Sequence, residues 1–408
     1  MKGVVFRFSI PRYALTLVLG RVLPAAYYGA LACVQLDELP EPRLLNDHWV
    51  KVKTRYGGIC GSDVGLVRLH DSPSSSPYTS LPFVFGHENV GSVAEVGTSV
   101  KDLVVGQRVV VDPVLPCPTR DLPEWCPHCR QGEWSRCSNV REGTPGVGFQ
   151  LGNNMSVGGS WAPYYLAHPF QVFALPDSVS DENAILVDAF ASALHPVMRS
   201  RPSNDQTALV LGAGTMGVCV VAALRAAGFS GRLLVAARYP FQAELARHYG
   251  ADVVMDARGD VYQAVADQTG GTLHKPVFGK RVMLGGGADV VYECVGSDET
   301  VDDALRLARP GGKVLLIGLS GVTKQVDWTF VWLKELSVAG TLCSSTEDYA
   351  GERKRCYEVI LNWMAEGRLD LTPLLTHRFR LEDYKRALAM SFHKSQHRMV
   401  KAVFEFPA

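Results

Sequence analysis

Four cysteines fall within one short stretch of the chain, with the spacing C-x8-C-x2-C-x7-C. They are Cys117, Cys126, Cys129 and Cys137. Four thiolates on turn-rich segments are the ligand set of a closed tetrahedral zinc site, which has a structural role. We therefore predict a structural zinc lobe, with a disulfide pair or an empty site as the alternative. His128 lies inside the cluster, but with four thiolates available we expect it to face solvent.

A second candidate metal site is dispersed along the chain. Cys60 stands in Gly57-Gly58-Ile59-Cys60-Gly61-Ser62-Asp63, and His87 stands in Gly86-His87-Glu88. Glycines beside a ligand let the backbone turn that ligand into a cleft. A lone cysteine and a lone histidine are more often core residues than zinc ligands, so these two residues alone do not establish a site.

A glycine-rich turn follows a short apolar run, Ala208-Leu209-Val210-Leu211. A strand, then G-x-G-x-x-G, then a helix is the arrangement of a dinucleotide-binding turn. Gly212 permits the tight turn, Gly214 lets the backbone approach a pyrophosphate, and Gly217 lets the helix pack close to the strand. The helix begins at Thr215 and Met216, and its N-terminus offers free N–H groups to phosphates. The alternative is a glycine turn without function.

The end of the next expected strand, Leu233–Ala236, predicts which dinucleotide binds. An NAD site places Asp or Glu there to bind the ribose 2′-hydroxyl. This chain has Ala237 followed by Arg238. A guanidinium suits the 2′-phosphate of NADP, so we predict NADP over NAD. The alternative for Arg238 is a solvated surface arginine.

Two patterns divide the chain. Residues 1–175 are rich in glycine, proline and short apolar runs, which indicates a β-rich domain. From about residue 180 strands and helices alternate, which predicts a doubly wound parallel sheet, and from about Cys343 the alternation stops. The expected domains are 1–185 with a zinc lobe at about 112–140, then 186–342, then a return over 343–408.

Some element boundaries are less regular. We expect a first strand over Gly3–Phe8, with an insertion before the strand near Trp49–Tyr56. Helices are expected over Asp181–Arg199 and Arg353–Glu366. No stretch reaches the ~18 apolar residues of a transmembrane helix, so we expect none.

Composition narrows the class of protein. The 408 residues hold 41 Lys plus Arg and 41 Asp plus Glu, and zero net charge argues against a general nucleic-acid or anionic-membrane binder. Ten cysteines in a chain of this length are too few for a disulfide scaffold. We therefore expect a cytoplasmic protein.

Taken in order, these motifs resemble the zinc-dependent medium-chain alcohol dehydrogenases. The match also includes Leu175–Ser180, Glu293-Cys294-Val295-Gly296 and Arg309–Lys313, and it extends from about Val50 to Phe404. The resemblance implies an α/β chain with a GroES-like β-rich catalytic domain, interrupted by a Rossmann doubly wound parallel-sheet domain.

The resemblance also implies a catalytic zinc held by Cys60 and His87. Glu88 is a ligand, or lies close to the metal, in the polyol and threonine branches. Relatives have Cys or Glu at the third protein position, where this chain has Asp188, whose shorter side chain ligates zinc directly or through water. Asp63 matches the acid that orients the imidazole of His87.

Further roles are implied for the reaction. Zinc would act as a Lewis acid on the substrate oxygen, while hydride passes between the substrate carbon and the nicotinamide. Ser62 would start a proton relay. Five residues are expected to frame the nicotinamide, namely Cys294, Val295, Gly296, Ile317 and Gly318. Lys401 or Arg398 is expected to reach the pyrophosphate.

The chain departs from the family pattern at four places. Pro118–Trp125 widens the lobe, which should bulge but keep its ligands. Gly65 replaces a relay histidine, which leaves His70 as a candidate exit or as a surface histidine. Ser72–Ser80 lengthens a loop near the substrate cleft, and the segment to about Leu36 is longer than usual.

The resulting hypothesis is a zinc- and NADP-dependent oxidoreductase of a secondary alcohol, polyol or sugar-like substrate and its carbonyl. Alternatives are a specialised biosynthetic dehydrogenase or carbonyl reductase on a larger substrate, and a non-catalytic NADP-binding protein. A zinc-ribbon nucleic-acid binder is disfavoured by the charge balance. The expected partners are a small-molecule substrate and further copies of the chain in a homodimer or homotetramer, with no nucleic acid and no membrane.

Overall fold

The computed structural model describes residues 1–319 and 321–407, and the chain divides into two compact units. Unit 1 contains Met1–Asp188, Ser344–Thr346 and the chain from Lys354 onward, and unit 2 contains Ala189–Cys343 and Glu347–Arg353. These boundaries fall near the expected residues 185 and 342, but the tip of the hairpin formed by β17 (Thr346–Tyr349) and β18 (Glu352–Arg355) groups with unit 2.

Unit 1 is built on two sheets. The larger has the order β19 (Leu375–Phe379), β20 (Lys401–Glu405), β3 (Val50–Ile59), β5 (Asn89–Val96), β6 (Arg108–Val111) and β8 (Val172–Ala174), with β7 (Tyr164–Ala167) paired to β3. The smaller has the order β2 (Val34–Glu38), β1 (Lys2–Phe6) and β4 (Phe83–Val84). Both contain mainly antiparallel pairs.

The register of the larger sheet collects distant residues at one edge. Gly57 of β3 pairs with Asn89 at the start of β5, and Ile59 pairs with Ala402 near the start of β20. The residues just beyond these strand ends therefore lie near one another, although they are hundreds of positions apart in the chain. This edge positions the candidate site.

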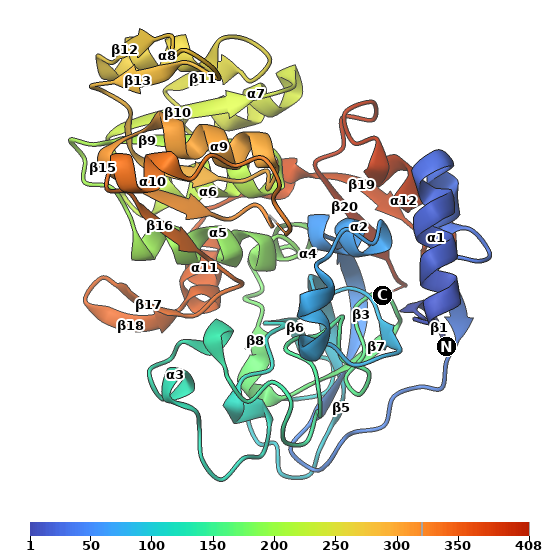
Figure 1. Ribbon diagram of the computed structural model, residues 1–408. Helices are drawn as coiled ribbons and strands as arrows, with labels where there is room; N and C mark the ends of the chain where they lie inside the picture. Colours follow the sequence, from blue (N-terminus) through green and yellow to red (C-terminus); the bar gives the residue numbers. More distant parts are fainter. Residues whose placement is uncertain (320, 408) are drawn as a thin grey trace. The chain divides into compact units, whose positions relative to one another are not determined.

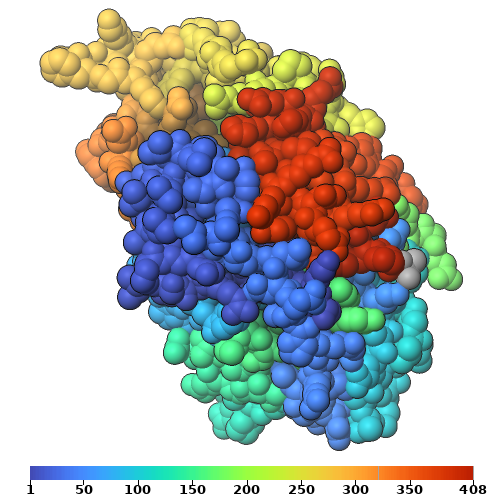
Figure 2. Space-filling view, turned by 90° about the vertical axis from the view of Figure 1, so that its right-hand side faces the viewer, coloured from blue at the N-terminus to red at the C-terminus, as the bar shows by residue number. Residues whose placement is uncertain are grey.

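Helices and aromatic residues complete unit 1. The helices are α1 (Ile10–Val22), α2 (Gly61–Val67), α3 (Pro127–Arg130), α4 (Asp181–Ala184), α11 (Cys356–Ala365) and α12 (Tyr384–Phe392). In the core, Trp161 stacks on Phe85 with ring centroids 5.1 Å apart and meets the edge of Phe404 at 5.0 Å. N-terminal and C-terminal segments thus share one core, and Figure 2 shows the blue and red parts of the chain side by side.

Unit 2 is a parallel sheet with helices around it (Figure 1). Its strand order is β11 (Val253–Asp256), β10 (Arg232–Ala237), β9 (Thr207–Leu211), β14 (Ala288–Glu293), β15 (Ala308–Leu316) and β16 (Ser337–Gly340). The helices are α5 (Val187–Arg199), which starts at the unit boundary, α6 (Thr215–Ala226), α7 (Pro240–His248), α8 (Val261–Thr269), α9 (Asp298–Leu307) and α10 (Thr329–Leu333), and β12 (Thr272–His274) pairs with β13 (Val282–Leu284). The strand order reverses beside β9, where doubly wound sheets bind ligands at their carboxyl ends.

Three elements differ from the sequence expectations. The helix expected over Asp181–Arg199 is two helices, α4 and α5, joined through two buried residues. The start of the helix expected over Arg353–Glu366 is extended as part of β18. The N-terminal insertion contains α1, which begins where Ser9 accepts a hydrogen bond from Arg12 N and Pro11 fills the first turn. Across residues 1–319 and 321–407, every helix is too short or too polar to cross a bilayer.

Candidate active site

Cys60, His87 and Glu88 form a cluster at the edge of the larger sheet. One ligand atom from each, a thiol sulfur, a ring nitrogen and a carboxylate oxygen, lies within 4.8 Å of the other two. Cys60 follows the end of β3 and caps α2, and Glu88 directly precedes β5. A Cβ at Gly58 would lie 2.2 Å from Glu88 Oε2, so only glycine at this position of β3 admits the carboxylate.

Asp63 contacts two residues of the cluster, one through each of its carboxylate oxygens. Oδ2 accepts a hydrogen bond from Cys60 N at 2.9 Å, and Oδ1 lies 3.4 Å from His87 Nδ1. Burial opposes protonation of His87, but the Asp63 carboxylate outweighs burial and raises the pKa of the imidazole well above its usual range. A more basic imidazole, oriented through one nitrogen, is a better metal ligand through the other.

Lys401, at the start of β20, belongs to the same cluster. Its side chain is 3% exposed, and Nζ forms an ion pair with Glu88 Oε1. We expected Lys401 at the pyrophosphate, whereas the structure places it in unit 1 beside a candidate metal ligand; Arg398 is exposed in a left-handed turn. In the sequence, Lys401 directly precedes the apolar residues Ala402, Val403 and Phe404. This position indicates a buried lysine, and a buried lysine needs an anionic partner.

Asp188 lies beside the cluster. Its Oδ1 accepts a hydrogen bond from Tyr357 OH at 2.8 Å. Burial raises the pKa of Asp188 to about 6, His87 acts to lower it, and Glu88 adds to the rise. Asp188 therefore interacts electrostatically with His87 and Glu88. Its oxygens do not belong to the group of ligand atoms from Cys60, His87 and Glu88 that all lie within 4.8 Å of one another. Tyr357 was not identified from the sequence.

The side chains present fit a catalytic zinc ion. A thiolate, an imidazole and a carboxylate are donors that zinc accepts, and three protein donors leave a fourth position open for substrate. Glu88 Oε2 is buried without a hydrogen-bond partner among the described residues. An unpaired buried carboxylate oxygen is costly, and coordination to a cation removes that cost.

The expected proton relay begins on α2. Ser62 is half-buried in the first turn of this helix, two residues after Cys60. A Cβ at Gly65 would lie 3.4 Å from Asp71 Oδ1. The Asp71 carboxylate therefore lies beside Gly65, where relatives have a histidine side chain. His70, the exit considered from the sequence, is exposed.

The four cysteines of the lobe also form one cluster. All are buried, and their sulfurs lie within 4.8 Å of one another. Cys126 N and Asn139 Nδ2 each donate to Cys117 Sγ at 3.3 Å, contacts that stabilise a thiolate. Between Cys117 and Cys126, Thr119 and Arg120 are buried and residues 123–125 are exposed, and the longer segment leaves the two thiols in one cluster. This donor set fits a closed structural zinc site.

Two further residues of the lobe, His128 and Arg120, lie near the four cysteines. His128 lies outside the thiol cluster, where its Nδ1 is 2.9 Å from Glu133 Oε2. Arg120, which the sequence did not single out, is fully buried and donates to the carbonyl oxygens of Leu115, Glu142, Gly146 and Gly148. Its positive charge interacts with the neighbouring thiols and offsets the negative charge of a four-thiolate site.

The nucleotide-binding turn in unit 2 has the geometry that its motif requires. Gly212 has a φ of +92°, and a Cβ at Gly217 would lie 1.8 Å from Gly212 O. Gly214 caps α6, so Thr215 and Met216 lie in the first turn with their N–H groups at the helix N-terminus. Such a terminus attracts phosphates.

The carboxyl end of β10 carries no acidic side chain. Ala237 is buried and Arg238 is exposed, with its guanidinium 5.9 Å from the centre of the Tyr239 ring. Asp256, the last residue of β11, pairs with Ala237 of β10 and accepts hydrogen bonds from Arg258 N and Nε. Two arginines thus stand at the ends of adjacent strands.

The loops expected near the nicotinamide are packed together. A Cβ at Gly318 would lie 2.2 Å from Gly296 N, so the turns after β14 and β15 are in contact. Glu293 Oε1 accepts hydrogen bonds from Val295 N, Gly296 N and Thr300 Oγ1, each at 2.8 Å. Glu293 is fully buried and fixes the loop that holds Cys294, a role that its place in the motif did not reveal.

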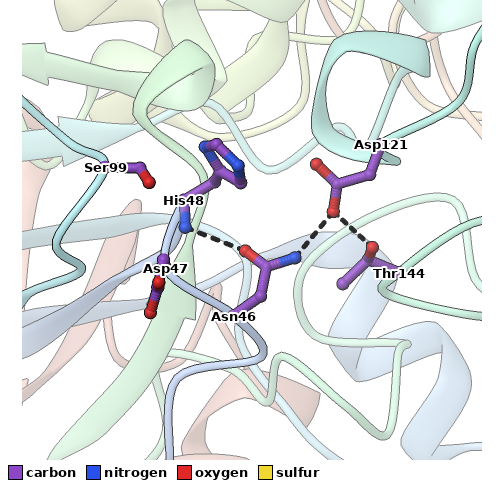
Figure 3. A pocket seen from close by; sticks show the side chains of 6 residues that line it. All are labelled: Asn46, Asp47, His48, Ser99, Asp121 and Thr144. Carbon is purple, nitrogen blue, oxygen red and sulfur yellow. Dashed lines mark hydrogen bonds between the residues drawn. The ribbon is translucent and has the colours of Figure 1, made fainter.

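A surface hollow in unit 1 is separate from these residues. It is lined by Asn46, Asp47, His48, Ser99, Asp121 and Thr144 (Figure 3). Asn46 accepts from His48 N at 2.9 Å and donates to Asp121 Oδ2 at 2.8 Å, and Thr144 donates to the same oxygen. Because several of these groups bind one another and no expected site residue lines the hollow, we assign it no function.

Comparison with protein families identifies two matching models. Residues 46–177 match the alcohol dehydrogenase GroES-like domain, and residues 215–358 match the zinc-binding dehydrogenase domain. L-Idonate 5-dehydrogenase of Vitis vinifera is 28% identical over 337 residues, covering 82% of each chain. Sorbitol dehydrogenase of Arabidopsis thaliana is 28% identical over 335 residues, covering 81% of each chain.

Solved structures show the same fold. An alcohol dehydrogenase of Escherichia coli CFT073 complexed with NADH has a TM-score of 0.72 at 23% identity, covering 100% of this chain and 99% of that one. A zinc-binding dehydrogenase of Sinorhizobium meliloti 1021 bound to NADP has a TM-score of 0.69 at 25% identity, covering 91% of this chain and 95% of that one. The fold class and the family resemblance expected from the sequence are confirmed.

Proposed function

Because the chain belongs to the zinc-dependent medium-chain dehydrogenases, an enzyme family that oxidises and reduces alcohol-type substrates, we propose an NADP-dependent member. Its substrate is a secondary alcohol, polyol or sugar-like molecule, interconverted with its carbonyl. Each chain holds one catalytic and one structural zinc.

The observation that carries the proposal is the cluster of Cys60, His87 and Glu88, with an unpaired buried oxygen on Glu88. A bound zinc would supply Lewis acidity toward the substrate oxygen. Asp63 keeps the imidazole of His87 in the orientation that ligation needs, and Lys401 balances part of the charge on Glu88. Ser62 would accept the substrate proton at its Oγ while it releases its own hydroxyl proton toward solvent, and the Asp71 carboxylate beside Gly65 would be the next acceptor on this path.

The cofactor preference rests on the end of β10. A nicotinamide cofactor carries the hydride, and the helix N-terminus at Thr215 and Met216 binds its phosphates. Arg238 binds the 2′-phosphate that distinguishes NADP, while Ala237 leaves the space without a repelling carboxylate. Glu293 does not contact the cofactor in this proposal. It accepts hydrogen bonds from Val295 N and Gly296 N, and so it fixes the loop of Cys294, Val295 and Gly296, which packs against Gly318. This loop, with Ile317 and Gly318, frames the nicotinamide.

The test is a panel of secondary alcohols, polyols and ketones with NADP(H) and NAD(H) in parallel, with zinc counted per chain. We expect turnover with NADP(H), two zinc ions per chain, and a rise of about tenfold or more in the KM for NADP(H) in the Arg238→Gln variant. The KM for NAD(H) should stay unchanged in that variant. A higher kcat/KM with NAD(H) in the unmodified chain contradicts the cofactor assignment, and no turnover with two zinc ions bound contradicts the activity.

The proposal includes the assembly and the location expected from the sequence. The chain acts as a homodimer or homotetramer on a small-molecule substrate in the cytoplasm. Light scattering on the purified protein measures the assembly.

A further inference from the structure

Helix α1 presents an apolar face to the outside of unit 1. The helix lies in the insertion between β1 and β2 and is visible beside α12 in Figure 1. Its exposed apolar residues at a spacing of three and four positions are Leu15, Val18, Leu19 and Val22, which are 39%, 63%, 43% and 88% exposed, and Leu23 just beyond the helix is 60% exposed. Large apolar side chains at this spacing form one stripe along a helix.

Packing fixes the direction of this stripe. On the opposite side of α1, a Cβ at Gly20 would lie 2.4 Å from Tyr27 Cζ, and Thr16 is buried with its hydroxyl donating to Arg12 O at 2.7 Å. Tyr13 and Leu17 pack against the core of unit 1. The helix therefore cannot turn its stripe inward without losing the contact between Gly20 and Tyr27.

The charges that border the stripe are positive. Arg12 and Arg21 are the charged residues of α1, whereas the two other cations of residues 1–36, Lys2 and Arg7, form ion pairs with Glu382 and Asp37. At 100° per residue, Arg12 and Arg21 lie at opposite borders of the outward face. The zero net charge of the whole chain argues only against a general binder of anionic membranes and leaves this local pair of arginines possible.

We propose that α1 docks unit 1 on an anionic lipid surface, with the helix axis in the plane of the bilayer. An apolar stripe bordered by cations is the arrangement of interfacial helices, whose apolar residues enter the acyl boundary while arginines bind headgroups. A helix of 13 residues is too short to span the bilayer, so it lies at the interface. Self-association through the same face would bring the Arg12 and Arg21 borders of two copies together without an acid to pair them.

The experiment is co-sedimentation of the full-length protein with vesicles of phosphatidylcholine and phosphatidylserine, compared with pure phosphatidylcholine. We expect binding to the anionic vesicles that weakens with salt. The double variant Val18→Glu/Val22→Glu should lower the partition coefficient by about tenfold or more. Val104→Glu/Val105→Glu is the matched control, because both valines are 65% exposed elsewhere in unit 1, and it should bind as the unmodified chain does.

Several outcomes overturn the proposal. These are no binding to anionic vesicles, equal binding to both vesicle types, and equal loss of binding in the two double variants. A soluble dimer that dissociates when Val18 and Val22 are replaced assigns the stripe to a second copy of the chain instead. Circular dichroism of each variant establishes that α1 and the fold persist, and none of the four valines belongs to the proposed catalytic machinery.

Discussion

Asp63 contacts two residues of the candidate metal site, Cys60 and His87, with a different carboxylate oxygen for each. In Asp63→Asn, an amide oxygen still accepts from Cys60 N, but the negative charge that orients His87 is lost. We expect zinc affinity at this site to fall by about 10- to 100-fold, measured by competition with a chelator. Asp102→Asn, at an exposed position, is the control, and equal affinity in both variants would show that Asp63 does not support the ligands.

The ion pair of Glu88 and Lys401 leads to a second prediction. Lys401→Met removes the cation from a buried carboxylate, and we expect the metal-free chain to lose about 3–5 kcal/mol of unfolding free energy. The double variant Lys401→Met/Glu88→Gln removes both charges and should recover most of that loss. Urea unfolding measures both variants. A double variant as unstable as the single one would show that the cost is not that of an unpaired charge.

The sequence predicted the cluster residues that lie in local motifs, and missed those that reach it from afar. Cys60, His87 and Glu88 are recognisable because glycines flank them within a few positions. Lys401 pairs with a residue 313 positions away, and lysines in a sequence are ordinarily surface residues. Arg120 escaped notice for the same reason, since its partners are backbone carbonyls that no sequence pattern marks.

The turn between β7 and β8 contains a histidine that must stay neutral. His168 Nδ1 accepts a hydrogen bond from Phe170 N at 3.2 Å, and burial lowers the pKa of His168 to about 4. The unfolded chain, with a histidine pKa of ~6.5, therefore takes up the proton first as the pH falls. The stability that His168 contributes is complete above ~6.5 and is lost toward pH 4.

We expect this effect to reach about 2–3 kcal/mol near pH ~4.5. The His168→Asn variant keeps an acceptor for Phe170 N but does not titrate. Unfolding free energies of both proteins at neutral and acidic pH provide the measurement, and the unmodified chain should lose more stability on acidification than the variant. Parallel losses in the two proteins would contradict the assignment.

At the scale of elements, the sequence was most informative where local pattern decides the structure. The continuous apolar runs Ala208–Leu211 and Leu233–Ala236 are buried and lie in the parallel strands β9 and β10 of unit 2, as their alternation with helices predicted. In unit 1, the pairing of β3 with β20 joins residues more than 300 positions apart, and no local pattern contains that information. Helix α1 was missed because its outward face is apolar, which obscures the usual period of polar and apolar residues.

At the scale of the molecule, the two candidate sites lie in different units. The cluster of Cys60, His87 and Glu88 lies wholly in unit 1, and the glycine-rich turn from Gly212 to Gly217 lies wholly in unit 2. We expect removal of zinc by a chelator to abolish turnover while the Kd for NADPH changes by less than about threefold. NADPH fluorescence measures the binding, and readdition of zinc should restore turnover. A Kd that rises in step with zinc loss would show that the two functions are coupled.

The order of segments along the chain has a consequence for synthesis on the ribosome. Unit 2 is encoded between two parts of unit 1, so nearly all of it has left the exit tunnel before β19 and β20 are translated. Domains generally fold as units while translation proceeds. Here the nascent nucleotide-binding unit can fold first, whereas the earlier-translated GroES-like part must wait for β19 and β20. Glu88 meets Lys401 only after the segment beyond unit 2 has been translated, so the proposed metal site is completed later than the nucleotide-binding unit, although Cys60, His87 and Glu88 precede that unit in the chain.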